Sequence, residues 1–287
     1  VNIQLNILET TSSISLNVAE LEIKKVSIDN NSDNISNWEI DEDYEILKIN
    51  FSNKIEIGEH NLSLEFNGLL NDKLRGFYHS SFIDENGETQ SIATTQFEST
   101  DARRAFPCFD EPEYKAVFSV TLTVEKELFC LSNAEIKQIS EEENSTLKSI
   151  EFEDTIPMST YLVAFIIGPF EASRTINVEG TNLRIIYPKG KGHLCEFSLE
   201  MGEYALRYFS NYYKIPYPGD KLDMVAIPDF AFGAMENLGC ITYREALLLV
   251  DTQMATSNEL IRIADVICHE IAHMWFGDLV TMKWWNG

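Results

Sequence analysis

Two histidines and a glutamate near the end of the sequence have the types and the spacing of a zinc site. The segment HEIAH occupies residues 269–273, so His269 and His273 are four residues apart and Glu270 follows the first of them. On a helix, side chains at this spacing project from one face, so both imidazoles could bind one ion at about 2.0–2.1 Å. Glu270 would then act as the general base toward a zinc-bound water, whose pKa zinc lowers to about 7.

A chance match to this short pattern is the alternative explanation, because the chain contains five histidines. The surroundings favour a functional motif, since they predict a helix. Thr256 and Glu259 offer a capping box at its start, and Gly277 offers a stop at its end. We therefore expect a metal site here. The other histidines lie far away in strands or loops, and surface or capping roles are expected for them: His60, His79 and His193.

The first half of the chain has the alternation of β-strands. Residues 49–66 alternate around a glycine-containing turn and predict a hairpin, and residues 116–125 alternate with period two. Residues 161–168 form a continuous apolar run, which is typical of a strand buried on both sides. Sustained helical periodicity is missing before about residue 190. These patterns predict an all-β sandwich.

The second half changes to a mixed pattern. Aromatic and apolar residues recur at helical spacing after residue 194, and Pro216 ends that segment. A strand is predicted over residues 222–228 and a second helix from about Thr256. The sequence therefore predicts an all-β domain followed by an α/β (α+β) domain. The boundary falls near residues 172–182, and we divide the chain into residues 1–176 and 177–287.

Composition limits the possible partners and surroundings. The chain of 287 residues carries 22 basic and 46 acidic side chains, a formal net charge of −24, which argues against a nucleic-acid partner. The five cysteines form no C-x-x-C pair, which argues against a thiolate zinc site and suits a reducing compartment.

Since no apolar run reaches 18 residues, no membrane segment is predicted. We expect a cytoplasmic location. A membrane-anchored or secretory protein is the alternative if a targeting segment lies outside a sequence whose two ends look cut.

A second motif, GAMEN at residues 233–237, lies about thirty residues before the histidines. Alone, it would be interpreted as a glycine-started turn with a solvated glutamate. Together with HEIAHMWFGDLVTMKWW, it resembles the gluzincin aminopeptidases of family M1. Further similar segments cover nearly the whole chain. They are LRGFYHSSF (74–82), TTQFESTDARRAFPCFDEPEYKAVF (94–118), PMSTYLVAFIIGPFE (157–171) and YYKIPYPGDKLDMVAIPDF (212–230).

The resemblance implies a fold and an activity. Residues 1–176 would form the saddle-like β-sandwich domain of the family, and residues 177–287 the start of its thermolysin-like catalytic domain. The activity would be zinc-dependent removal of the first residue from peptides with a free N-terminus. Glu236 and Glu98 would hold the α-ammonium group, because two carboxylates around one ammonium give charge-assisted hydrogen bonds that an internal peptide bond cannot give.

Further site residues are implied by the same resemblance. Gln96 would lie beside Glu98, and Met235 would line the pocket for the first side chain. Gly233 and Ala234 would offer backbone hydrogen bonds to an extended peptide, and Asn237 completes this substrate-binding segment. The third zinc ligand would be a glutamate nineteen residues after His273, five positions beyond residue 287. One Zn²⁺ per full-length chain is expected, and the chain as given is expected to bind it weakly and to be inactive alone.

Departures from the family pattern concern three positions. Leu238 stands where the family usually has tryptophan, Cys240 replaces an aliphatic residue, and Phe232 is bulkier than usual. All three are expected to touch the wall of the site and to affect substrate preference.

Two alternative functions within the same fold remain. One is an epoxide-hydrolase-like member of the family. Such a member would have glycine where this chain has Ala234 and glutamine where it has Glu98. The other is a scaffold without catalysis. Nearby charged residues are expected to form structural ion pairs rather than to catalyse: Asp101, Arg103, Arg104 and Asp110.

Overall fold

The first six strands form two three-stranded antiparallel sheets around a common core. The computed structural model describes residues 1–84 and 86–286. The sheet orders are β1-β6-β3 and β2-β5-β4, and both sheets bury alternate apolar side chains in one cluster. The strands are β1 (Asn2–Ile7), β2 (Thr11–Asn17), β3 (Leu21–Ile28), β4 (Ile35–Asp41), β5 (Ile46–Ile55) and β6 (Gly58–Gly68).

The predicted hairpin over residues 49–66 is wrong. β5 and β6 are both strands, but β5 pairs with β2 and β4, whereas β6 pairs with β1 and β3. The chain passes from one sheet to the other at Gly58, where φ is +140°, a conformation that side-chain-bearing residues rarely adopt. Alternation sets which face of a strand is buried, and here both strands face the same core without pairing.

A second β region follows and is also antiparallel. Its sheets have the orders β10-β13-β8-β7 and β11-β12-β9. The predicted strand over residues 161–168 is buried except for the half-buried Phe165, but only its last three residues form a strand, because residues 160–162 form a 3₁₀ turn. The elements are β7 (Gly76–Ile83), β8 (Thr89–Gln96), η1 (Ala102–Arg104), β9 (Thr121–Glu125), β10 (Phe129–Leu131), β11 (Ile136–Glu141), β12 (Leu147–Phe152), η2 (Thr160–Leu162) and β13 (Ile166–Gly168).

The last region is a six-stranded mixed sheet with two helices. Its order is β14-β16-β17-β19-β18, with β15 on β16, and the central β16, β17 and β19 are parallel. The sheet begins at Phe170, and the predicted domain boundary after residue 176 stays a prediction. The elements are β14 (Phe170–Ala172), β15 (Ile176–Val178), β16 (Thr181–Pro188), η3 (Gly192–Leu194), α1 (Glu196–Tyr213), β17 (Lys221–Ile227), β18 (Ala234–Met235), β19 (Cys240–Arg244), η4 (Glu245–Leu247) and α2 (Ser257–His273).

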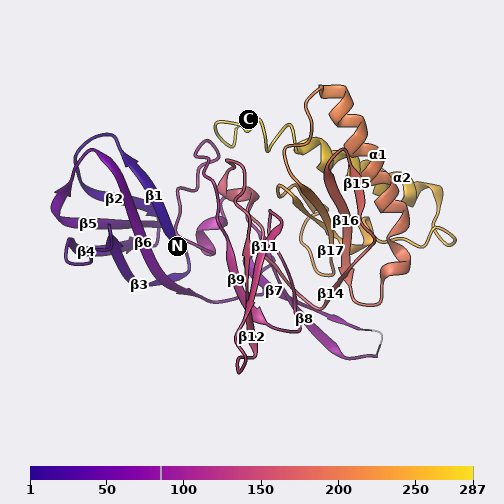
Figure 1. Ribbon diagram of the computed structural model, residues 1–287, viewed down its shortest axis with the longest axis horizontal. Helices are drawn as coiled ribbons and strands as arrows, with labels where there is room; N and C mark the ends of the chain where they lie inside the picture. The colour runs from indigo at the N-terminus through magenta and orange to yellow at the C-terminus, as the bar shows by residue number, and fades with distance from the viewer. Residues whose placement is uncertain (85, 287) are drawn as a thin grey trace.

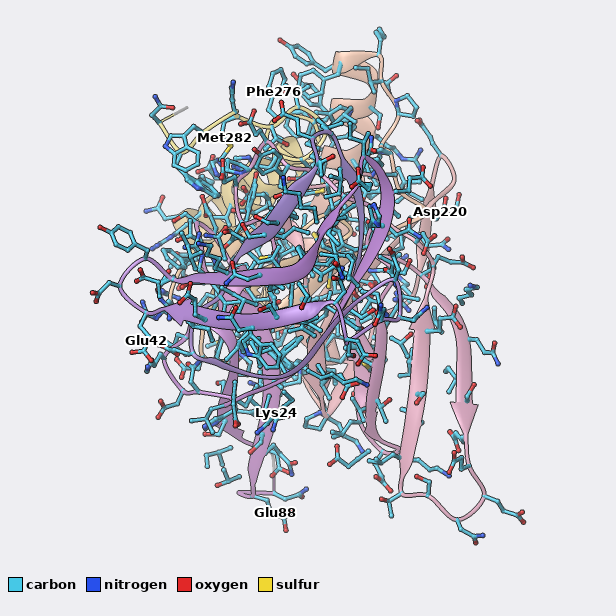
Figure 2. The ribbon with its side chains drawn as sticks, turned by 90° about the vertical axis from the view of Figure 1, so that its left-hand side faces the viewer. Lys24, Glu42, Glu88, Asp220, Phe276 and Met282 are labelled. Atoms are coloured by element: carbon cyan, nitrogen blue, oxygen red, sulfur yellow. The ribbon has the colours of Figure 1, made fainter. Side chains whose placement is uncertain are left out.

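The predicted fold class is confirmed, since a β-rich region precedes a region in which the first α-helix begins at residue 196. Figure 1 shows β1–β6 at one end, β7–β12 in the middle, and α1 and α2 beside β15–β17 at the other end. In Figure 2, Phe276 and Met282 lie at one edge of the molecule and Glu88, between β7 and β8, at the opposite edge. None of the helices in residues 1–84 and 86–286 is long and apolar enough to cross a bilayer.

Both helices begin and end close to their predicted limits. Thr256 and Glu259 form the predicted capping box: the Glu259 amide donates to Thr256 Oγ1 at 3.3 Å, and the Thr256 amide donates to Glu259 Oε2 at 2.8 Å. α2 ends at His273, four residues before the predicted stop at Gly277. In α1, small and apolar residues pack on the sheet, while the tyrosines at helical spacing lie on the exposed face: Tyr204, Tyr208 and Tyr212.

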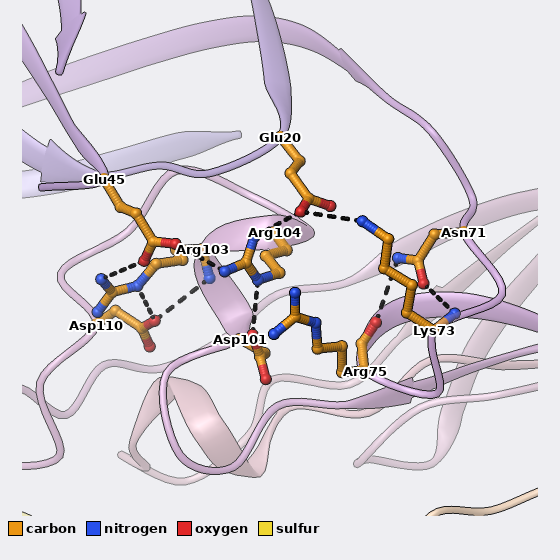
Figure 3. Close-up of polar contacts among 9 residues, drawn as sticks. All are labelled: Glu20, Glu45, Asn71, Lys73, Arg75, Asp101, Arg103, Arg104 and Asp110. Atoms are coloured by element: carbon orange, nitrogen blue, oxygen red, sulfur yellow. Dashed lines mark hydrogen bonds and ion pairs between the residues drawn. The ribbon is translucent and has the colours of Figure 1, made fainter. Parts of the chain in front are cut away.

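A network of ion pairs joins the two β regions (Figure 3). Arg104, on η1, donates to three carboxylates: Asp101 at 2.7 Å, Glu20 at 2.9 Å and Glu45 at 2.7 Å. Its side chain is only 12% exposed. The predicted structural ion pairs are therefore present, and they tie the loop after β8 to the turns of the first region. The neighbouring Arg103 adds pairs with Glu45 at 3.0 Å and Asp110 at 2.9 Å.

We expect Arg104→Met to lower the free energy of unfolding by about 2 kcal/mol, because it leaves partly buried carboxylates without their cation. The expected loss of unfolding free energy is small because Glu20 is exposed and solvent screens its pair with Arg104. Lys73→Met is the matched control. Lys73 also pairs with Glu20, at 3.4 Å, but both side chains are exposed, so the loss should stay below about 1 kcal/mol. Urea unfolding followed by circular dichroism measures both, and equal losses would contradict the importance of Arg104.

Candidate functional site

The two histidines of the motif lie on the last turn of α2 with their rings close together. His269 Nε2 and His273 Nε2 are 3.1 Å apart, and the ring centroids are 4.7 Å apart. Two nitrogens bound to one tetrahedral zinc at 2.0–2.1 Å would be separated by about 3.3 Å. The pair therefore fits the predicted metal. Within residues 1–84 and 86–286, no group of three potential ligands is placed to hold an ion, so these two imidazoles are the ligands the structure offers.

The orientation of His273 is set by the turn that follows it. His273 Nδ1 lies 2.8 Å from the carbonyl oxygen of Phe276. Because a carbonyl can only accept, Nδ1 carries the proton and Nε2 keeps its lone pair for a metal. The next residue, Gly277, has φ of +137°, and a Cβ there would lie 3.0 Å from His273 Nδ1. The turn therefore requires glycine both for its backbone and for the space beside the imidazole.

Glu270 lies inside the protein next to these ligands. It is 5% exposed, and its Oε2 has no hydrogen-bond partner among the described residues. Burial first, and then the nearby carboxylates of Glu236 and Glu98, together raise the pKa of Glu270 to about 8. A carboxyl group in such surroundings is suited to accept and return a proton near neutral pH.

Glu98 and Glu236 reach the same place from two separate segments. Glu98 follows β8, and Glu236 follows β18. Glu236 Oε1 is 3.9 Å from His273 Nδ1. The pKa of Glu98 is raised by burial and by the Glu236 carboxylate, while His273 lowers it. The structure thus brings together three carboxylates and the imidazole of His273, although more than 170 residues of sequence separate Glu98 from His273.

The GAMEN segment forms an edge of the six-stranded sheet. Ala234 and Met235 pair with β19, and the carbonyl of Gly233 accepts from the amide of Arg244 at 2.8 Å. β18 is the last strand in the order of this sheet, so its other edge has no partner strand in the described part of the chain. Such an edge can bind an extended peptide through its backbone.

Two other predicted substrate-binding side chains are buried. Gln96 is the last residue of β8, and its Oε1 has no hydrogen-bond partner among residues 1–84 and 86–286. Asn237 Nδ2 donates to Thr242 Oγ1 at 3.2 Å and to the Cys240 carbonyl at 3.4 Å. The side chain of Asn237 therefore holds the turn between β18 and β19, while its Oδ1 has no described partner.

The positions that depart from the family pattern differ in burial. Leu238 and Cys240 are both buried in the main hydrophobic core. Leu238 also lines a cavity of about 110 Å³ whose described lining includes Asn133 and Tyr217 but none of the predicted site residues. Only Phe232 is exposed. Burial alone does not exclude a position from the wall of the site, since Met235 is buried in the same core, so the expectation stays a prediction for all three.

Three residues near the site were not singled out from the sequence. Lys115 and Tyr161 donate to backbone carbonyls of the turn after α2, and Asp278, in that turn, is a buried carboxyl without a described hydrogen-bond partner. Burial raises the pKa of Asp278 well above its usual value, and Glu236 adds to the shift. No spacing pattern marks Lys115 or Tyr161, because their contacts are made with residues more than 100 positions away.

Comparisons with known proteins cover almost the entire chain. The family model described as Peptidase M1 N-terminal domain matches residues 1–162, and the one described as Peptidase family M1 domain matches residues 197–287. Aminopeptidase M1-D of Oryza sativa subsp. japonica is 44% identical over 276 residues, 96% of this chain and 31% of the relative. Aminopeptidase M1 of Arabidopsis thaliana is 43% identical over 292 residues, 100% of this chain and 33% of the relative.

A relative from another organism gives a similar match. The puromycin-sensitive aminopeptidase of Caenorhabditis elegans is 41% identical over 287 residues, 99% of this chain and 30% of the relative. The chain therefore spans about a third of the length of the curated relatives that it matches.

Proposed function

The chain belongs to peptidase family M1, and from this premise we propose that it contributes the zinc-binding helix and the amine-binding carboxylates of an aminopeptidase. The proposed reaction is hydrolysis of the first peptide bond of peptides that have a free N-terminus. The relatives carry the name aminopeptidase, which supports the reaction class.

One observation carries the proposal: two imidazoles and three carboxylates meet where β8, β18 and α2 come together. Burial and neighbouring carboxylates raise the pKa of both Glu270 and Glu98, and His273 lowers the pKa of Glu98. Buried carboxylates that repel one another are stabilised when cations bind among them. A metal ion on the imidazoles and an ammonium group between the carboxylates are cations that would meet this need.

His269 and His273 would hold the zinc ion through their Nε2 atoms. When bound, zinc supplies Lewis acidity toward the scissile carbonyl and the attacking water. A catalytic zinc normally takes three protein ligands, and the family pattern predicts a glutamate nineteen residues after His273 as the third.

Glu270 would move the protons of the reaction. Its carboxylate takes a proton from the attacking water and passes that proton to the nitrogen of the leaving amine, so that the C–N bond breaks without expelling an amide anion. Its burial beside the histidines supports this role, because a desolvated carboxylate is a stronger base than one in water.

Glu236 and Glu98 would fix the register of the peptide. Both carboxylates would bind the α-ammonium group, and the backbone of Gly233 and Ala234 would bind the peptide, Ala234 from the free edge of β18. Gln96 would lie beside the ammonium, Met235 would line the pocket for the first side chain, and Asn237 would hold the segment in place. Since the ammonium group is one residue away from the scissile bond, only the first residue can be removed.

Two further proposals concern the domain boundary and the cellular location. We propose that the chain divides after residue 176, between the two matched family domains. We also propose a cytoplasmic location, which the five free cysteines support.

The experiment that tests the proposed function follows the products of one peptide over time. The purified full-length protein should contain one zinc per chain and should shorten a decapeptide from its N-terminus one residue at a time, as mass spectrometry would detect. A zinc chelator should stop the shortening and added zinc should restore it. Internal fragments as first products, or cleavage that continues after zinc removal, would contradict the proposal.

A further inference from the structure

Three consecutive backbone carbonyls after the zinc-binding helix are all bound by side chains from the β regions. Tyr161 donates its hydroxyl to the carbonyl of Gly277 at 3.1 Å. The ammonium of Lys115 donates to the carbonyl of Asp278 at 2.8 Å and to that of Leu279 at 3.1 Å. Donors from the β regions therefore bind the turn that follows the helix.

The two donors are neighbours because their own segments pair. Ala116 and Met158 form an isolated antiparallel bridge, with both N–O distances at 3.0 Å, which brings Lys115 and Tyr161 to the same place. Thr160 Oγ1 also donates to Asp110 at 2.8 Å, and Asp110 belongs to the network of Arg103 and Arg104. The segments that carry Lys115 and Tyr161 are therefore fixed to each other and to the ion-pair network of the β regions.

The turn that they hold is the one that orients His273. The Phe276 carbonyl accepts from His273 Nδ1 at 2.8 Å, and the amide of Asp278 donates to the His273 carbonyl at 3.1 Å. Gly277 lies between these two contacts and leaves no space beside the imidazole for a side chain. A shift of the turn would consequently move the Phe276 carbonyl and rotate the ring of His273.

The ammonium of Lys115 binds backbone carbonyls and no carboxylate of the described residues. Within residues 1–84 and 86–286 its ammonium forms no ion pair, and the two carbonyls are its only hydrogen-bond partners. A cation beyond the C-terminal end of α2 is favourable for the helix dipole. Partial burial lowers the pKa of Lys115, and the nearby buried carboxyl of Asp278 raises it.

From these contacts we infer that Lys115 and Tyr161 are positioning residues for His273. They hold the turn of residues 274–280 and, through the Phe276 carbonyl, keep the His273 imidazole in the orientation that binds zinc. This inference rests on the proposed function, because it assigns the two residues to the same metal site. Contacts behind a metal ligand commonly change metal affinity by about 10–100-fold when they are removed.

The test measures zinc affinity separately from folding. The variants are Lys115→Met, which keeps most of the chain length without the donors, and Tyr161→Phe, which keeps the ring that packs on Trp285. Zinc dissociation constants of the full-length proteins are obtained by competition with a chelator. The melting temperatures of the zinc-free proteins report on folding. We expect zinc affinity to fall about tenfold in each variant.

Matched controls separate positioning from general stabilisation. Tyr78→Phe removes a similar bond, from a buried tyrosine hydroxyl of β7 to the carbonyl of Asp229 at 3.2 Å, outside the turn. Lys283→Met removes an exposed lysine that lies 3.8 Å from Glu113. Both controls should keep the wild-type zinc affinity, while Tyr78→Phe should lower the melting temperature of the zinc-free protein about as much as Tyr161→Phe.

Three results would overturn the inference. Wild-type zinc affinity in both Lys115→Met and Tyr161→Phe would do so, and so would an equal loss of affinity in Tyr78→Phe. If the wild-type protein itself binds no zinc, the proposed function fails and the inference fails with it. The first two results leave the proposed function intact, so the two failures can be distinguished.

Discussion

Replacing Glu270 by glutamine should lower kcat about 1,000-fold while the full-length protein keeps its zinc. Removing a general base usually costs 10²–10⁴-fold in rate, and glutamine has the size of glutamate but cannot accept the proton. The side chain is almost fully buried, so an isosteric replacement should leave the packing of α2 unchanged. The measurement is kcat on a free-amine aminoacyl substrate at saturation, together with the zinc content of the same preparation.

Asp265→Asn is the control for the Glu270 variant. Asp265 is an exposed carboxylate of the same helix, so its replacement changes the charge of α2 equally without entering the site. It should leave kcat within about a factor of two, as expected of an exposed surface substitution. A Glu270→Gln protein with near-normal kcat would show that another group carries the proton, and a loss of zinc would show that Glu270 acts on the metal ligands instead.

Replacing Glu236 by glutamine should lower kcat/KM for free-amine substrates about 100-fold. A hydrogen bond to a charged group contributes roughly 1.5–3 kcal/mol, and the larger value corresponds to a little over a factor of 100. N-acetylated peptides have no ammonium group, so their slow cleavage should change little. The ratio of kcat/KM between free and acetylated forms of one peptide therefore measures the role of Glu236, and Glu98→Gln should lower this ratio in the same direction.

Glu245→Gln provides the comparison for Glu236. Glu245 lies in η4, next to β19, and is paired with Lys191 at 2.7 Å. Its loss should affect stability and leave the ratio of free to acetylated cleavage unchanged. If Glu236→Gln slows the free and the acetylated peptide equally, Glu236 supports the site without recognising the amine. Equal cleavage of both peptides by the wild-type protein would remove the basis of the assignment.

The parts of the structure that the sequence predicted well depend on neighbours within one or two helical turns. The capping box of Thr256 and Glu259 involves residues three apart, and the histidines of α2 are four apart. Such contacts are determined by helix geometry alone. The convergence of Glu98 on α2 was different, because only the family resemblance placed it there.

The features that the sequence did not predict depend on contacts between distant segments. Alternation in β5 and β6 indicated which side chains are buried, but it could not indicate that the two strands join different sheets. The burial of Leu238 and Cys240 depends on elements that pack against them from elsewhere in the chain. Lys115 gave no signal in the sequence, because a lysine that binds carbonyls looks the same as one that faces solvent.

The contacts between the β regions and the turns beside the candidate site also bear on the order of folding. They join residues separated by 163 positions for Lys115 and Asp278, 151 for Tyr78 and Asp229, and 116 for Tyr161 and Gly277. Closing loops of this length costs chain entropy before the contacts form, and long-range contacts of this kind slow folding. The turn after α2 should therefore reach its final shape only after the β sheets have formed. Local opening of the same contacts would disturb the proposed metal site while most of the β structure persists.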